Sequence, residues 1–247
     1  LWGVDWLRVR PKSFGYPAFS IAGYSRLGDA TSLPIFRHTN TYQIMDGLSI
    51  VWGSHIFKIG GEIRHLQLDS RLDLFTRGSM SFSGAFTGSG AGDLLLGLVT
   101  FGIQANADNP ITLRNTAYNL YFQDDWKVRP DFTLNLGMRY EYNTPPTDPQ
   151  DAMSTLNPKT GQVVRVGTEG ISRSGIRSDQ DNFAPRVGFA WTAPAKLVVR
   201  GGYGLYYDSG MFVVNSAQYF NPPQFSLRVF FPTETSLLTL ANPFPSS

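Results

Sequence analysis

One stretch, YNLYFQDDWKVRPDFTLNLGMRYEYN at 118–143, constrains the fold more than any other feature of the chain. Apolar and polar side chains alternate along it with a period of two, which is the period of a β-strand. One parity is apolar, as at Leu120, Phe122 and Met138, and the other is polar, as at Gln123 and Arg139. Strands this long with one apolar and one charged face predict a sheet whose two sides meet different surroundings.

The same alternation recurs along most of the chain, whereas a helical period is almost absent. Most of the strands that it predicts exceed the usual length of about 5 or 6 residues. No segment approaches the roughly 20 consecutive apolar residues of a membrane-spanning helix. We predict strands at 40–52, 55–68, 74–86, 99–107, 112–128, 132–143, 183–192 and 196–208, with weaker candidates at 19–25 and 224–231.

Three tight turns define the clearest hairpins, 40–68, 112–143 and 183–208. A register that slips by one residue would turn a whole face the wrong way, so apolar residues must pair with apolar residues across each turn. With a two-residue loop at 53–54 and three-residue loops at 129–131 and 193–195, all three hairpins satisfy this condition. The predicted pairs are Trp52 with His55, Ile50 with Phe57, Leu48 with Ile59, Ile44 with Ile63, Trp126 with Leu134, Phe122 with Met138, Leu120 with Tyr140, Trp191 with Leu197, Phe189 with Val199, and Pro185 with Tyr203.

The connections between the hairpins are long and polar at 144–182 and 209–247. Short turns on one side and long loops on the other are typical of an outer-membrane barrel, with the turns in the periplasm and the loops outside the cell. We place 87–98 as a further connection on the periplasmic side. The predicted fold class is all-β, an antiparallel transmembrane β-barrel segment that includes the whole chain, 1–247.

Aromatic side chains cluster at the ends of the predicted strands. Rings of amphipathic aromatics that bracket an apolar band of about 25 Å mark the two lipid–water interfaces of a barrel. The general preference of aromatics for strands is the alternative explanation, but it does not account for three Trp beside three turns. We predict an interfacial belt of Trp52, Trp126, Phe132 and Trp191 at the turns, and of Tyr140, Tyr142 and Tyr206 at the opposite ends.

The polar parity is predicted to face a polar lumen, and the apolar parity to face lipid. Asp124 has the apolar parity, so we expect it near the periplasmic rim or in a bulge. Leu136 and Phe189 are assigned to the middle of the lipid face. The lumen-facing candidates are Lys58, Glu62, Arg64, Gln123, Asp125, Arg139, Glu141, Arg186 and Arg200.

Other functions find little support. The net charge of +2 is too small and too scattered to indicate nucleic-acid binding. The three histidines, His38, His55 and His65, lack metal-ligand spacing. A carboxylate pair of Asp125 and Glu141 would rest on shared parity alone, and polar lumen lining explains it better. We therefore expect no catalytic residue, no metal, no cofactor and no enzyme.

Four motifs resemble the TonB-dependent outer-membrane receptors, specifically the Oar-like barrels. They are YFQDDWKV (121–128), LNLGMRYE (134–141), FAPRVGFAW (183–191) and VRGGYGLYYD (199–208), with an echo in FKIGGEIR (57–64). The resemblance covers about 39–208. It implies a barrel of about 22 strands in the outer membrane of a Gram-negative bacterium, filled by an N-terminal plug domain and energised by the TonB complex.

The resemblance further implies uptake or export of a bulky solute, whose identity it leaves open. No plug is present in this sequence, so we expect an internal barrel fragment of a longer receptor. The alternative is a soluble or cell-surface β-sandwich or propeller-like module that binds carbohydrate or protein. The two differ in what the apolar face touches, either outer-membrane lipid or a protein core.

Overall fold

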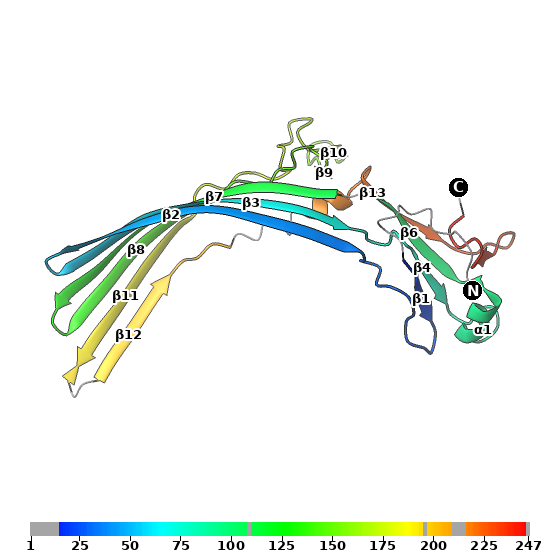
Figure 1. Cartoon of the computed structure of the whole chain (residues 1–247), viewed down its shortest axis with the longest axis horizontal. Helices are drawn as coiled ribbons and strands as arrows, with labels where there is room; N and C mark the ends of the chain where they lie inside the picture. The colour runs from blue at the N-terminus through cyan, green and yellow to red at the C-terminus, as the bar shows by residue number, and fades with distance from the viewer. Residues whose placement is uncertain (1–14, 108–109, 195–196, 209–215, 246–247) are drawn as a thin grey trace.

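The computed structural model describes residues 15–107, 110–194, 197–208 and 216–245 (Figure 1). Six long strands form one antiparallel sheet, here called the wall, in the order β12-β11-β8-β7-β3-β2. The strands are β2 (Ile35–Trp52), β3 (His55–Leu72), β7 (Pro110–Arg129), β8 (Phe132–Asn143), β11 (Phe183–Ala193) and β12 (Leu197–Gly204). Most of these strands are longer than the predicted ones, because pairing with neighbours extends each of them past its alternating stretch.

The first two tight turns lie together with the end of β11 and the start of β12 at one end of the wall, the turn end (Figure 1). The predicted registers of the first two hairpins are confirmed, with Trp52 opposite His55 and Trp126 opposite Leu134. Gly53 has a φ of 57°, which suits the first central position of a type II′ turn. A register shift between Lys127 and Arg129 places a bulge beside the second turn.

The third hairpin closes in a different register from the predicted one. Trp191 pairs with Val199, and Ala193 pairs with Leu197, whereas the sequence predicted Trp191 opposite Leu197. The two registers differ by two residues, so they put the same side chains on the same faces. Alternation alone therefore could not distinguish them.

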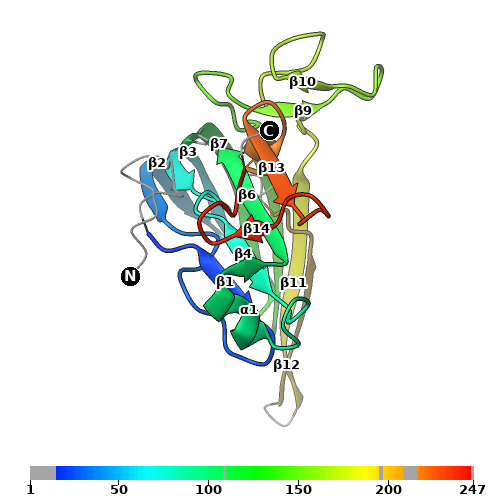
Figure 2. The same cartoon turned by 90° about the vertical axis from the view of Figure 1, so that its right-hand side faces the viewer.

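A second, four-stranded sheet lies at the other end of the molecule, the loop end (Figures 1 and 2). Its order is β1-β4-β6-β13, so its strands come from the segment before β2, the connection between β3 and β7, and the segment after β12. Its core contains Ile21, Met80, Phe82, Val99, Leu238 and Leu240. The elements are β1 (Ala18–Ile21), β4 (Ser79–Phe82), α1 (Gly90–Leu96), β5 (Leu98–Val99), β6 (Phe101–Ala107), β13 (Phe225–Phe230) and β14 (Leu238–Thr239).

The prediction for 74–107 was wrong in two ways. The segments 74–86 and 99–107 are not wall strands, because β4 and β6 belong to the loop-end sheet. The connection 87–98 contains helix α1 and lies at the loop end, not at the turn end. Gly-rich loops around a short helix leave too little alternation to reveal this fold. With the correction, every long connection leaves the wall at the same end.

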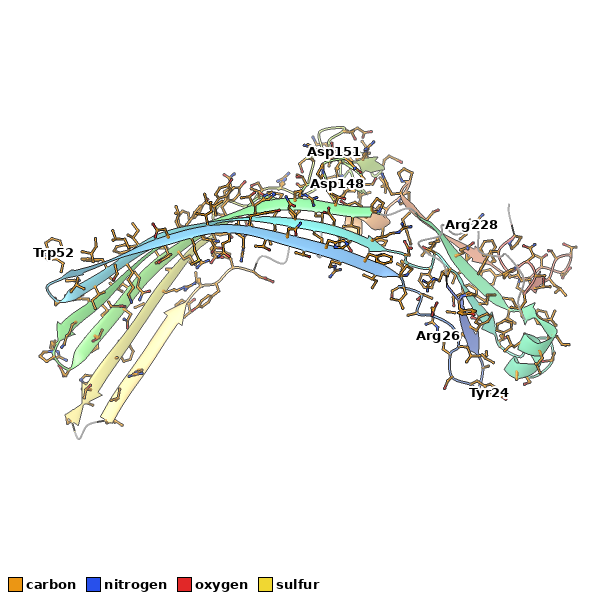
Figure 3. All side chains as sticks on the ribbon, viewed as in Figure 1. Tyr24, Arg26, Trp52, Asp148, Asp151 and Arg228 are labelled. Atoms are coloured by element: carbon orange, nitrogen blue, oxygen red, sulfur yellow. The ribbon has the colours of Figure 1, made fainter. Side chains whose placement is uncertain are left out.

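Residues 144–182 and 216–225, here called the cover segments, lie against the loop end of the wall. They contain β9 (Ser154–Leu156), β10 (Val163–Arg165) and the 3-10 turn η3 (Ala217–Phe220). Figure 3 marks the region with Asp148 and Asp151, far from Trp52 at the turn end. The core between the cover segments and the wall consists of Leu68, Ile111, Leu113, Met153, Val166 and Tyr219.

The wall remains open at both sides. Among the described residues, no further strand pairs with the outer edge of β2 or of β12. No helix in the described part of the chain is long and apolar enough to cross a membrane.

Candidate functional site

The register places all nine predicted lumen residues on one face of the wall, here called the polar face. Cross-strand partners share a face, and the rows of partners run unbroken from β2 to β12. One row joins Lys58, Gln123 and Gly137 to Arg186, and another joins Glu62 and Asn119 to Glu141.

Three ion pairs neutralise six of the nine residues. Lys58 Nζ lies 2.7 Å from Asp125 Oδ2, and Arg64 Nε lies 3.6 Å from Glu62 Oε1. Arg139 pairs with Glu141. Charges that face water rarely stabilise a protein by more than about 1 kcal/mol per pair, so these pairs fix the arrangement of the face more than its stability.

Asp125 is the centre of a larger network on the polar face. The side-chain amides of Gln123 and Asn135 donate to its Oδ1 at 2.8 and 2.7 Å, while Lys58 donates to Oδ2. Three donors from three strands thus converge on one carboxylate. Asp125 is held in place as an acceptor, which fits lumen lining.

A groove of about 420 Å³ lies on the polar face between β7 and β12. Its floor contains Gly137, Gly188 and Gly202, and Arg186 rises beside it. The Arg186 guanidinium lies 4.5 Å from the centre of the Tyr206 ring, within the range of a cation–π contact. The belt prediction for Tyr206 was therefore wrong. Tyr206 shares the even parity of Arg200 and Gly204, which lie on the polar face, and its ring lies on that face beside Arg186.

Tyr121 is a polar-face residue that the sequence prediction missed. A Cβ atom built on Gly60 would lie 2.6 Å from its hydroxyl oxygen, and one built on Gly47 would lie 2.8 Å from it. The Tyr121 ring therefore lies flat over these two glycines, across β3 and β2. The signal was present in the sequence, because Gly47, Gly60 and Tyr121 become cross-strand neighbours once the register is known.

The opposite face, the apolar face, is exposed and apolar over the turn half of the wall. Two aromatic rungs bracket this band, Tyr118 with Tyr142 and Trp126 with Leu134. They are eight residues apart on β7, about 26 Å along the strand, which matches the apolar band of an outer-membrane barrel. The exposed side chains of the band include Ile44, Leu48, Ile50, Ile59, Ile63, Leu120, Phe122, Met138, Val187 and Val199.

The other six belt candidates lie on the apolar face at the ends of this band. Trp52, Trp126, Phe132 and Trp191 stand at the turn end, and Phe132 pairs directly with Trp191. Tyr140 and Tyr142 lie toward the loop end, where the Tyr142 and Tyr118 rings stack with centroids 6.1 Å apart.

Along the strands, both faces of the wall change their polarity at the same level: toward the loop end the apolar face becomes polar and the polar face becomes apolar. On the apolar face, Ile63 and Tyr118 are followed toward the loop end by His65 and Thr116, then by Asp69 and Arg114, which form an ion pair of 2.7 Å. On the polar face, the charged residues give way to the buried Leu68, Ile111 and Leu113 beneath the cover segments. A single boundary thus separates a lipid-compatible half of the wall from a half with a polar outside and an apolar inside.

Two carboxylates interrupt the apolar face. Asp124 lies one rung from Trp126, as predicted for a position near the rim, and its Oδ2 is 2.8 Å from His55 Nδ1. His55 in turn stacks between Phe57 and Trp126. Asp46, on the edge strand β2, was missed by the sequence prediction. Its Oδ1 accepts the backbone N–H of Gly47 at 2.8 Å.

The cover segments join the wall through Tyr219. Its buried hydroxyl donates to Asp148 Oδ2 at 2.7 Å and accepts the backbone N–H of Thr112 at 3.1 Å. Burial and the adjacent Asp148 carboxylate raise the pKa of Tyr219 above its usual value. The tyrosine therefore stays protonated and connects η3, the segment after β8 and strand β7 at one point.

Within the described residues, no group of three or more His, Cys, Asp or Glu side chains is arranged to hold a metal ion. No curated protein and no solved structure matches the chain. The family model described as outer membrane beta barrel domain matches residues 4–247, nearly the whole sequence. The long amphipathic strands, the hairpins at one end and the bracketed apolar band agree with that match, and the chain belongs to the family of outer membrane beta barrel domains.

Proposed function

We propose that this chain forms part of the wall of a TonB-dependent, Oar-like outer-membrane receptor, which moves a bulky solute through a plugged barrel. One observation carries the proposal: the cover segments pack on the polar face, the same face that bears the paired charges. If the polar face lines the lumen, the cover segments lie over its mouth, where a solute would first be bound.

The polar face also supports the proposed plug. Arg64 Nε and Arg139 Nε are buried, and each lies beside a carboxylate of the same face, Glu62 or Glu141. A face lined by such paired charges suits contact with a polar domain inside the barrel. The partners proposed by resemblance are an N-terminal plug domain and the TonB complex, in a Gram-negative cell. We assign the chain no enzymatic role.

The alternative, a soluble binding module of the sandwich or propeller type, would need a second layer over the apolar face. No described element covers that face over the turn half, where Ile44 is 79% and Leu120 is 60% exposed. Membership of the outer membrane beta barrel family also favours the membrane. Cell fractionation separates the two functions, since a soluble module would leave the membrane without detergent.

Transport can be tested without knowing the solute. Culture media from three strains would be compared by mass spectrometry: the wild type, a strain without this protein, and a strain without TonB. We expect one solute whose concentration changes in the wild-type medium and in neither mutant medium. A solute that still depends on this protein but not on TonB would indicate a passive pore and contradict the proposal.

A further inference from the structure

We propose that the groove beside Arg186 binds the anionic group of the solute, and that this solute is an acidic, hydroxyl-rich molecule of the acidic-saccharide class. The inference rests on the proposed function, because it takes the polar face to be the lumen. It adds a specific subsite and a ligand chemistry.

Charge is the first reason. The three carboxylates among the nine lumen candidates each have a cationic partner, Lys58, Arg64 or Arg139. Arg186 and Arg200 form no ion pair with any described residue. Of these two, only Arg186 lines the groove. The groove therefore holds a positive charge that the described part of the wall does not neutralise.

Space is the second reason. A Cβ atom on Gly137 or Gly188 would meet its nearest neighbours at 3.6 and 3.5 Å, an ordinary van der Waals contact. Neither glycine has a positive φ, so the described fold does not require glycine at these positions. Gly60 differs, because Tyr121 fills the space above it. At Gly137 and Gly188, the missing side chains leave an open floor. The volume of about 420 Å³ is in the range of small-molecule sites.

Hydrogen-bonding chemistry is the third reason. The amide groups of Gln123 and Asn135 border the groove, and both use an N–H to bind Asp125. Asn135 Oδ1 lies over the floor, 3.8 Å from the Cβ position of Gly188. Each amide keeps its carbonyl oxygen and a second N–H, so the groove offers acceptors and donors beside a single cation. A ligand with hydroxyl groups, which donate and accept, together with an anion matches this lining.

The position of Arg186 is fixed before any ligand arrives. Its guanidinium lies over the Tyr206 ring, and Gly204 permits this approach, since a Cβ there would lie 3.1 Å from Arg186 Cγ and 3.3 Å from the Tyr206 ring. A planar guanidinium held in this way presents its donors to a carboxylate with little loss of conformational freedom.

Direct binding to the detergent-solubilised protein tests the subsite. The probes are tetragalacturonate, which is acidic, and maltotetraose, which is neutral and of equal length, in isothermal titration calorimetry at low and high salt. We expect the wild type to prefer tetragalacturonate. Arg186→Gln should weaken that binding about 10- to 100-fold, as for the loss of a hydrogen bond to a charged group.

Two further variants keep the result interpretable. Arg200→Gln removes the same charge from the same face outside the groove and should change binding by less than about 2-fold. Gly188→Val fills the floor without changing the charge and should weaken binding by at least about 10-fold, through overpacking. Equal losses for Arg186→Gln and Arg200→Gln would overturn the proposal, because they would indicate general attraction to a positive lumen.

The subsite and the transport function can fail separately. Selective binding that needs Arg186, combined with transport that does not need TonB, would keep the subsite and refute the proposed function. If the wild type binds neither probe and Arg186→Gln lowers the free energy of unfolding, then a carboxylate of the polypeptide already occupies the groove. That result would overturn the subsite and leave the proposed function intact.

Discussion

Replacing Met138 by arginine tests the assignment of the apolar face to lipid. Met138 is 43% exposed on that face and pairs with Phe122, midway between the two aromatic rungs. Each rung is four residues away, about 13 Å along the strand. An arginine at the midplane of a barrel costs about 2 to 4 kcal/mol, so the folding equilibrium constant in lipid should fall about 30- to 700-fold.

The matched control is Met45→Arg, the same substitution on the polar face of the same sheet. Met45 is 69% exposed and lies opposite Glu62, which can accept the new cation. We expect its cost to stay within about 0.5 kcal/mol. Leu136, chosen from the sequence as a midplane site, is less suitable because it pairs with Asp124, and that carboxylate would offset the cost of a nearby arginine.

Folding titrations of both variants in lipid vesicles, followed by tryptophan fluorescence, give the two free energies. Equal costs for Met138→Arg and Met45→Arg would refute the reasoning, because both faces would then meet the same medium. A larger cost for Met45→Arg would reverse the two faces and remove the basis for a polar lumen.

Three further predictions concern single contacts. Tyr219→Phe leaves Asp148 without its buried donor, so it should cost about 1 to 3 kcal/mol and speed proteolysis of the cover segments; unchanged cleavage would show that Tyr219 does not hold them. For Asp93, burial opposes ionisation, but hydrogen bonds from Thr87 and Gly84 outweigh it and hold the pKa below 3.8. The contribution of the ionised Asp93 to stability is therefore complete above pH 3.8 and is lost as the pH falls through the lowered pKa. Hydrogen exchange around α1 should rise in that acid window. Asp93→Asn should remove this pH dependence of the exchange. Gly60→Val should displace the Tyr121 ring at a cost of about 1 to 3 kcal/mol, and a double-mutant cycle with Tyr121→Ala that gives no coupling would contradict this packing.

The hairpins of the wall were predictable from the sequence because the contacts within each hairpin are local, whereas the pairings of β3 with β7 and of β8 with β11 are not. Two tight turns set a register that alternation could check, and the pairs Trp52 with His55 and Trp126 with Leu134 followed directly. The register of the third hairpin was mispredicted because a shift by two residues leaves every side chain on the same face. Parity also assigned the nine lumen candidates to one face of the sheet, although the sequence contains no distances between them.

The loop end was not predictable in this way. Its strands β4 and β6 pair with β1 and β13, which are remote in the sequence, and no local pattern encodes such partners. Tyr206 was misplaced for a different reason, because it was assigned to the belt by its place at a strand end although it shares the parity of the polar-face residue Arg200. The groove depends on four strands at once, so no single stretch of sequence reveals it.

The loop-end sheet has a consequence for the order in which the molecule assembles. Each hairpin of the wall closes a short loop, which is fast and entropically cheap. The loop-end sheet instead needs β13 beside β6, and β1 beside β4, so segments from both sides of the wall must already be present. Its contact order is therefore high, because the complete sheet joins segments that precede β2, follow β3 and follow β12. Protease resistance of the complete loop-end sheet would report that these three segments have come together.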